Sequence, residues 1–114
     1  MGQLTTHVLD TAHGQPAAGM AYCLLDAAGT VLREGRTNAD GRCDGPLLAG
    51  EALVPGRYAL RFAVAAYFRA QGVSLPEPPF LDEVTLAFGV ADASAHYHVP
   101  LLVSPWSYST YRGS

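Results

Sequence analysis

Charged residues are scarce in this sequence, and the basic ones form no cluster. Asp, Glu, Lys and Arg make up 15% of the chain, the formal net charge is −3, and the seven basic residues are scattered. Proteins that bind nucleic acids or anionic membrane surfaces usually gather Lys and Arg on one face or in one run. We therefore expect neither nucleic acid nor a membrane among the partners.

Long apolar runs and closely spaced cysteines are also absent. No stretch approaches the ~20 residues that a membrane-spanning helix needs. The opening segment MGQLTTHVLD lacks the apolar core of a secretory signal. The two cysteines, Cys23 and Cys43, do not have CxxC spacing, which is typical of reduced thiols in a cytosolic protein. These features predict a cytoplasmic location.

Apolar residues, in contrast, are abundant. They make up 49% of the 114 residues, which is the composition of a globular protein rather than of a disordered one. A chain of this length normally forms one domain. We therefore expect a single domain over residues 1–114.

Alternation of apolar and polar residues with a period of two is the dominant pattern, and turn residues interrupt it. Residues 66–71 are typical of a short helix that Gly72 would end. A further short strand is expected to begin at Arg42, after an Asp-Gly turn, and residues 46–56 are expected to form a loop. The pattern predicts an all-β protein, an antiparallel β-sandwich of seven to eight strands with one short helix. The main predicted strands are residues 4–10, 20–26, 31–37, 57–65, 83–90, 96–103 and 107–111.

Pro100 conflicts with one of these strands, because a proline cannot donate a hydrogen bond to a neighbouring strand. Three explanations are open from the sequence. The strand lies at an edge, it contains a bulge, or the fold tolerates one missing hydrogen bond.

Three predicted strands each carry one His or Tyr on the face that points away from the core. In LTTHVLD, His7 shares this face with Thr5; in HYHVPLL, His98 lies opposite the apolar face; in SYSTYRG, the residue is Tyr111. If these strands are neighbours in one sheet, the face presents two imidazoles and a phenol. That combination suits proton transfer, because a neutral imidazole can accept or donate a proton near pH 7.

Each of these residues also has a structural explanation. A single His or Tyr on a strand more often packs or faces solvent than takes part in catalysis, and Arg42 after a hairpin turn is most often solvated. The only pair with metal-ligand spacing is His96-x-His98, which is a common pattern. The residues by themselves indicate a β-sandwich that has a His-containing binding face, and they give only weak support for a metal site.

Three segments resemble one enzyme family. They are LTTHVLD near the start, TNADGR in the middle, and HYHVPLLVSPWSYSTYRGS at the end. Together with the total length, they resemble the 5-hydroxyisourate hydrolases, which are the transthyretin-like enzymes of purine breakdown. The resemblance covers essentially the whole chain. The YRGS ending is its most specific part, because it separates the hydrolases from transthyretin itself.

The resemblance implies a transthyretin-like two-sheet sandwich that assembles as a homotetramer, a dimer of dimers, with the site in a channel between dimers. It implies hydrolysis of a cyclic amide in 5-hydroxyisourate, without a metal or other cofactor. The catalytic residues that it implies are His7, Arg42, His98 and Tyr111. The substrate-binding residues that it implies are His7, Arg42, Tyr111 and Ser114. The C-terminal tail is then expected to be held against the site, with Arg112 and the terminal carboxylate fixing it to neighbouring chains.

Two other functions remain open from the sequence. One is a transthyretin-like carrier that binds a small hydrophobic ligand in the same channel, and the other is a structural sandwich without a small-molecule site. The pair His7 and His98 and the YRGS ending favour the enzyme, because a carrier has no chemical reason to keep them. The sequence does not indicate which His acts as the general base.

Overall fold

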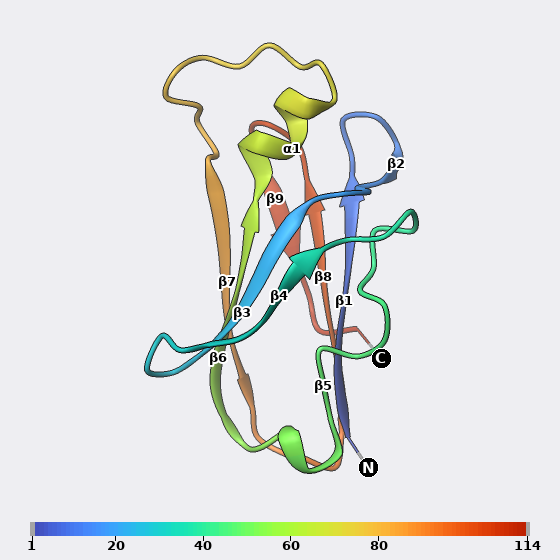
Figure 1. The fold of residues 1–114 in the computed structure, drawn as a ribbon, viewed down its shortest axis with the longest axis vertical. Helices are drawn as coiled ribbons and strands as arrows, with labels where there is room; N and C mark the ends of the chain where they lie inside the picture. The colour runs from blue at the N-terminus through green and yellow to red at the C-terminus, as the bar shows by residue number, and fades with distance from the viewer. Residues whose placement is uncertain (1, 114) are drawn as a thin grey trace.

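Two sheets packed face to face form the molecule, and the computed structural model describes them over residues 2–113 (Figure 1). In the first sheet the strand order is β2-β1-β8-β9, and β5 pairs with β1. In the second sheet the order is β4-β3-β6-β7. The first sheet contains β1 (Gln3–Asp10), β2 (Gln15–Pro16), β5 (Leu48–Ala49), β8 (His96–Val103) and β9 (Tyr108–Thr110). The second contains β3 (Ala21–Asp26), β4 (Val31–Arg36), β6 (Gly56–Ala63) and β7 (Glu83–Val90).

One α-helix, α1 (Val64–Ala70), follows β6 and lies at the end of the sandwich opposite the N-terminus (Figure 1). A 3₁₀ turn, η1 (Gly50–Ala52), follows β5. The helix packs Val64, Tyr67 and Phe68 into the core, at the three- and four-residue spacing of an amphipathic helix. Within residues 2–113, no helix is long and apolar enough to cross a membrane. The prediction of an all-β sandwich with one short helix is confirmed.

The core lies between the two sheets because each long strand turns alternate residues inward. In β1, Leu4, Thr6 and Val8 are buried, while the residues between them are partly exposed. From the second sheet, β6 contributes Tyr58, Leu60 and Phe62 to the same core. The alternation therefore separates a buried inner face from an outer face on which polar side chains can act.

Several predicted boundaries need correction. Arg42 opens no strand and instead makes one isolated bridge with His7. The segment 46–56 is not all loop, because it contains β5 and η1. Two-residue strands such as β2 and β5 have no periodic pattern of their own, since their pairing is set by the neighbouring β1. The helix begins at Val64 rather than residue 66, because buried Val64 and Ala65 suit either a strand or a helix pattern.

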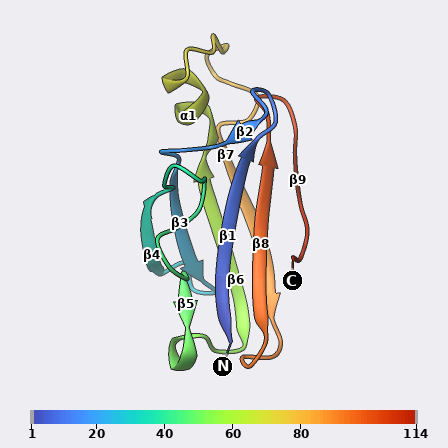
Figure 2. The ribbon, with the colours of Figure 1, turned by 90° about the vertical axis from the view of Figure 1, so that its right-hand side faces the viewer.

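β1 and β8 pair in parallel, whereas the other strand pairs are antiparallel. Figure 2 shows these two strands side by side on the face of the first sheet. Their register places Thr5 opposite His98 and His7 opposite Pro100. The strands that carry both predicted histidines are therefore direct neighbours.

Pro100 lies in a central strand, because β8 has β1 on one side and β9 on the other. Continuous pairing with β9 covers Leu101 to Val103, so it stops at the residue that directly follows Pro100. It resumes as a single bridge between His98 and Gly113. The missing donor of Pro100 thus falls where the ladder with β9 lapses, which excludes the edge-strand explanation.

Asp10 anchors the far end of β1 to the helix. Its buried carboxylate accepts hydrogen bonds from the His13 backbone N–H at 3.0 Å, from His13 Nδ1 at 2.6 Å and from the Tyr67 hydroxyl at 2.8 Å. Burial alone would raise the pKa of Asp10, but the hydrogen bonds from His13 and Tyr67 outweigh it, so the pKa is lowered. This anchor fixes the strand on which His7 and Thr5 lie.

Candidate active site

The outer face of the β1–β8 pair carries a row of polar side chains. The parallel register sets Gln3 beside His96 and Thr5 beside His98, and His7 follows on the same face of β1. Such a row forms because residues two apart in a strand point to the same side of the sheet. The prediction that His7 and His98 share a face of one sheet is confirmed.

Arg42 reaches this face through a tight turn over residues 38–41. The Asn38 side-chain oxygen accepts hydrogen bonds from the N–H groups of Asp40 and Arg42, at 2.9 and 3.1 Å. Gly41 takes a φ of +74° and its carbonyl accepts the Val8 N–H at 2.8 Å. A Cβ at Gly41 would lie 2.3 Å from the Val8 carbonyl oxygen. Only glycine permits this approach, so the turn is pressed against β1 and Arg42 is bridged to His7.

His7 is held by the same turn. Its Nε2 lies 2.8 Å from the carbonyl oxygen of Asp40. A carbonyl oxygen only accepts, so the Nε2 of His7 carries a proton and donates. The ring is therefore oriented, and in its neutral form the Nδ1 nitrogen holds the lone pair.

His98 is partly buried, and its Nδ1 lies 2.8 Å from the hydroxyl oxygen of Thr5. Burial lowers the pKa of His98, and the positive charges of Arg42, His7 and His96 lower it further. The imidazole is therefore neutral near pH 7. A neutral imidazole can accept a proton from water.

The C-terminal tail packs against His98 of its own chain, and its expected contacts with neighbouring chains remain a prediction. The Gly113 N–H donates to the His98 carbonyl at 2.8 Å. A Cβ at Gly113 would lie 2.7 Å from Cδ2 of the imidazole. Arg112 donates to the His96 carbonyl at 3.2 Å, and its guanidinium carbon lies 4.2 Å from the ring centroid of Tyr97. The tail is thus fixed within its own chain, on the wall beside His98.

A pocket of about 500 Å³ opens beside this row. Arg42 and His98 both line it, whereas His7 and Tyr111 do not. Several of its residues had no role in the sequence prediction, although Thr5 could have been found because it shares a face with His7. The full lining is Gln3, Thr5, Thr6, Arg42, Cys43, Gly45, Pro46, His96 and His98.

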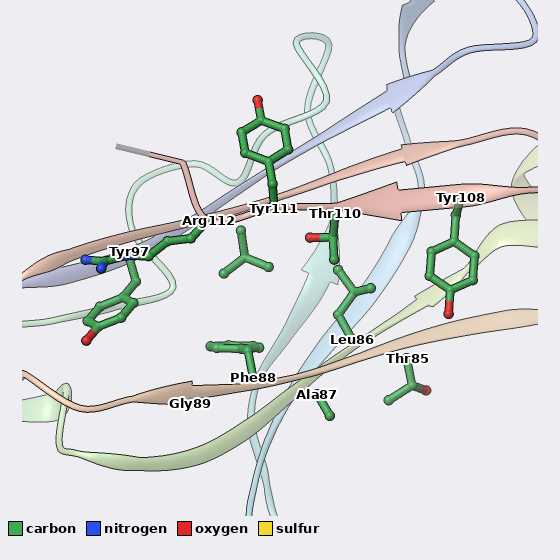
Figure 3. Close-up of a pocket in the computed structure, with 11 residues that line it drawn as sticks. Thr85, Leu86, Ala87, Phe88, Gly89, Tyr97, Tyr108, Thr110, Tyr111 and Arg112 are labelled. Atoms are coloured by element: carbon green, nitrogen blue, oxygen red, sulfur yellow. The ribbon is translucent and has the colours of Figure 1, made fainter.

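Tyr111 occupies a different part of the surface. It is 62% exposed and belongs to a second, mainly apolar pocket of about 400 Å³ at the open edge between β7 and β9. Its ring points away from Tyr108 and Leu86, which face that pocket (Figure 3). Ser114, the other predicted tail residue, lies outside the described residues. Within one chain the structure therefore groups His98 and Arg42 with the neighbouring His7, but not Tyr111.

No group of three or more His, Cys, Asp or Glu side chains within residues 2–113 could hold a metal ion. The expectation of metal-independent chemistry remains a prediction. The chemistry that the described residues can supply is a neutral imidazole and a guanidinium that line one pocket, with the oriented imidazole of His7 next to Arg42.

Fold and site together define a class of protein, a two-sheet β-sandwich with acid–base groups and a fixed cation on the outer face of one sheet. The chain belongs to the HIUase/Transthyretin family, which matches residues 4–113. It is 65% identical to the 5-hydroxyisourate hydrolase of Ralstonia nicotianae, with 100% of both chains covered.

Solved structures agree with this assignment. 5-Hydroxyisourate hydrolase from Klebsiella pneumoniae has a TM-score of 0.85 and 34% identity, with 100% of both chains covered. Sea bream transthyretin in complex with thyroxine has a TM-score of 0.85 and 29% identity, with 97% and 94% covered. An (S)-allantoin synthase has a TM-score of 0.94 and 45% identity, and the match covers 99% of this chain but only 44% of that longer one.

Proposed function

We propose that this chain hydrolyses 5-hydroxyisourate to 2-oxo-4-hydroxy-4-carboxy-5-ureidoimidazoline, a step of urate (purine) catabolism. Relatives with this activity in their names are up to 65% identical over the full length. The structural observation that carries the proposal is the placement of Arg42 and a neutral His98 around one pocket. Together they provide a base and a fixed positive charge beside a cavity that can hold a small ring.

The reaction needs one proton transfer in each direction. His98 or His7 takes a proton from water as its oxygen bonds to the ring carbonyl carbon, and the carbonyl oxygen becomes an oxyanion. The carbon–nitrogen bond then breaks, and the leaving nitrogen receives the proton. Arg42 stabilises the oxyanion or binds the substrate carbonyls, because its guanidinium is permanently charged and has a planar fork of donors.

Tyr111 and Ser114 complete the proposed set, Tyr111 by orienting the substrate ring and Ser114 by binding it. Tyr111 lies away from the pocket of its own chain, so we propose that its phenol contributes to the wall of a site formed between subunits. The proposed assembly is a homotetramer, a dimer of dimers.

Exposed features at one edge support the assembly. β7 and β9 each pair with only one other strand within residues 2–113, and unpaired edges of this kind readily associate. Phe80 and Trp106 stack with ring centroids 5.9 Å apart and are 69% and 60% exposed. Tyr108 adds a third exposed aromatic ring at β9. Together they form an apolar surface that a second subunit would cover.

We further propose a single hydrolase domain over residues 1–114, a cytoplasmic location and chemistry without a metal or cofactor. Both Cys23 and Cys43 are free thiols, which agrees with a reducing compartment. The scattered basic residues support the expectation that neither nucleic acid nor a membrane is a partner.

The test is a spectrophotometric assay in which urate oxidase generates 5-hydroxyisourate. The ultraviolet band of the substrate should decay faster when the protein is added, and heat-denatured protein serves as the control. Decay at the buffer rate would contradict the proposal and favour the carrier that the sequence left open.

A further inference from the structure

Four side chains form a continuous hydrogen-bonded row along the β1–β8 ladder. Gln3 Nε2 lies 3.4 Å from His96 Nε2, the Thr5 hydroxyl lies 3.2 Å from the same nitrogen, and the Thr5 hydroxyl lies 2.8 Å from His98 Nδ1. The row links the open end of the site to the His98 imidazole. Thr5 is its central member, because its one hydroxyl contacts both rings.

The direction of these hydrogen bonds follows from what each atom can do. The amide nitrogen of Gln3 only donates, so the Nε2 of His96 must present its lone pair. Thr5 has a single O–H donor. It donates this hydrogen to the same lone pair of His96 Nε2 to which Gln3 donates. The hydroxyl oxygen of Thr5 is then left to accept, and the group that it accepts from is the Nδ1–H of His98. The whole row therefore points one way, from His98 through Thr5 to His96.

We infer that Thr5 is a positioning residue that keeps the proton of neutral His98 on Nδ1 and leaves the lone pair on Nε2. The proton on one imidazole nitrogen is set by the hydrogen bond made there. The Nε2 of His98 has no hydrogen-bond partner among residues 2–113, and the side chain lines the pocket. The catalytic meaning of the inference rests on the proposed hydrolase function. It selects His98 as the base and Nε2 as the atom that takes the proton from water.

The surroundings of His98 make the hydroxyl more important. His7 from β1, His96 from its own strand and Arg42 from the turn all disfavour a charged imidazolium at this position, and the tail packs on the carbon edge of the ring at Gly113. Thr5 is the one described side chain that hydrogen-bonds to the ring. When Nε2 takes a proton, the Nδ1–H bond to Thr5 becomes charge-assisted and stronger. The hydroxyl thus favours the charged state that burial and the positive charge of Arg42 oppose.

The first test reads the proton position directly. Nitrogen-15 NMR of His-labelled protein at pH 8 should show the His98 ring protonated on Nδ1. Thr5→Val keeps the branched shape and removes the hydroxyl, so it should abolish this preference, while Thr5→Ser should restore it. Thr11→Val is the matched control, because it removes a hydroxyl that bonds to the Val103 carbonyl between the same two strands. A proton on Nε2 in the unmodified protein would overturn the inference.

The second test reads the pH profile of hydrolysis. Thr5→Val should lower kcat on the order of tenfold, with KM changed less than about twofold, because the base is less well positioned. The acid limb of the variant's pH profile should move to lower pH, since the Thr5 hydroxyl oxygen that is lost had stabilised the protonated His98 ring. If Thr5 instead donated to Nδ1, the same variant would move the limb to higher pH. An upward shift or no shift would therefore contradict the inference.

A third variant tests whether Gln3 sets the direction of the row. Gln3→Glu places an acceptor beside His96, which should reverse the hydrogen bonds and transfer the His98 proton to Nε2. Retention of the proton on Nδ1 in this variant would overturn the role of Gln3. Because the NMR measurement needs no substrate, it stands even if the protein fails to hydrolyse 5-hydroxyisourate. A protein that hydrolyses the substrate with Nε2 protonated would disprove this inference and leave the proposed function intact.

Discussion

The guanidinium of Arg42 differs from an ammonium group in geometry rather than in charge. Its planar fork can donate to two oxygens at once, whereas a lysine is a point donor. We expect Arg42→Lys to lower turnover on the order of 10²–10³-fold, comparable to the loss of an oxyanion donor. Steady-state rates on freshly generated substrate measure this effect.

Arg61→Lys is the control for this substitution. Arg61 is exposed on β6 of the second sheet and does not line the pocket. Its replacement should leave the rate unchanged. A near-normal rate for Arg42→Lys would remove Arg42 from the site.

His98 should set the acid limb of the activity profile. The base must be neutral to act, and burial and the neighbouring positive charges lower its pKa below the ordinary value of 6.5. We expect kcat/KM to remain high at pH 6.5 and to fall only at lower pH. A limb centred above pH 6.5 would contradict the environment described for this ring.

The same lowered pKa has a consequence for stability. The unfolded chain binds a proton at His98 more readily than the folded chain does, so this group favours unfolding as the pH falls below 6.5. Well above that pH the ring is neutral in both the folded and the unfolded chain, so His98 causes no loss of stability there.

At the scale of elements, the sequence predicted the long strands well and the contacts between them poorly. Alternation was sufficient for β1, β6, β7 and β8, because one face of each is buried. It could not predict that β1 pairs with β8 in parallel, since register depends on the partner strand. For the same reason, the face of Thr5 could be predicted but its contact with His98 could not. The family resemblance supplied the catalytic set that the residues alone left open.

The tail is the element that we expect to tolerate least change near the site. Gly113→Ala would place a methyl group 2.7 Å from the His98 ring, so the tail or the imidazole must move. We expect turnover to fall on the order of tenfold, about 1.4 kcal/mol of activation free energy, with little change in thermal stability.

Gly89→Ala is the matched control, because the nearest atom to its Cβ would be 3.9 Å away.

Two further variants test the whole tail. Deletion of residues 111–114 should abolish hydrolysis while the sandwich stays folded. Tyr111→Phe should lower turnover on the order of tenfold or more. A truncated protein with full rate and an unchanged melting temperature would show that the tail has no part in catalysis.

For the molecule as a whole, assembly should be required for activity, because Tyr111 lies away from the pocket of its own chain. Light scattering at assay concentration should show a tetramer. Tyr108→Asp introduces a charge at the exposed apolar edge and should weaken association and activity together.

Val31→Asp serves as the control at the opposite edge of the sandwich, on β4, where the side chain is 49% exposed. It should leave the tetramer and the rate intact. A fully active monomer would contradict the placement of the site between subunits.

The parallel pairing of β1 with β8 links catalysis to the completion of folding. Thr5 and His98 are 93 residues apart in the chain. Their contact therefore closes a loop that contains all the strands from β2 to β7. Contacts of this separation have a high entropic cost of closure and favour slow folding. A chain with only its second sheet formed would lack both the completed core and the Thr5–His98 hydrogen bond. Recovery of hydrolysis during refolding would then report the joining of the two ends, rather than the collapse of the sandwich.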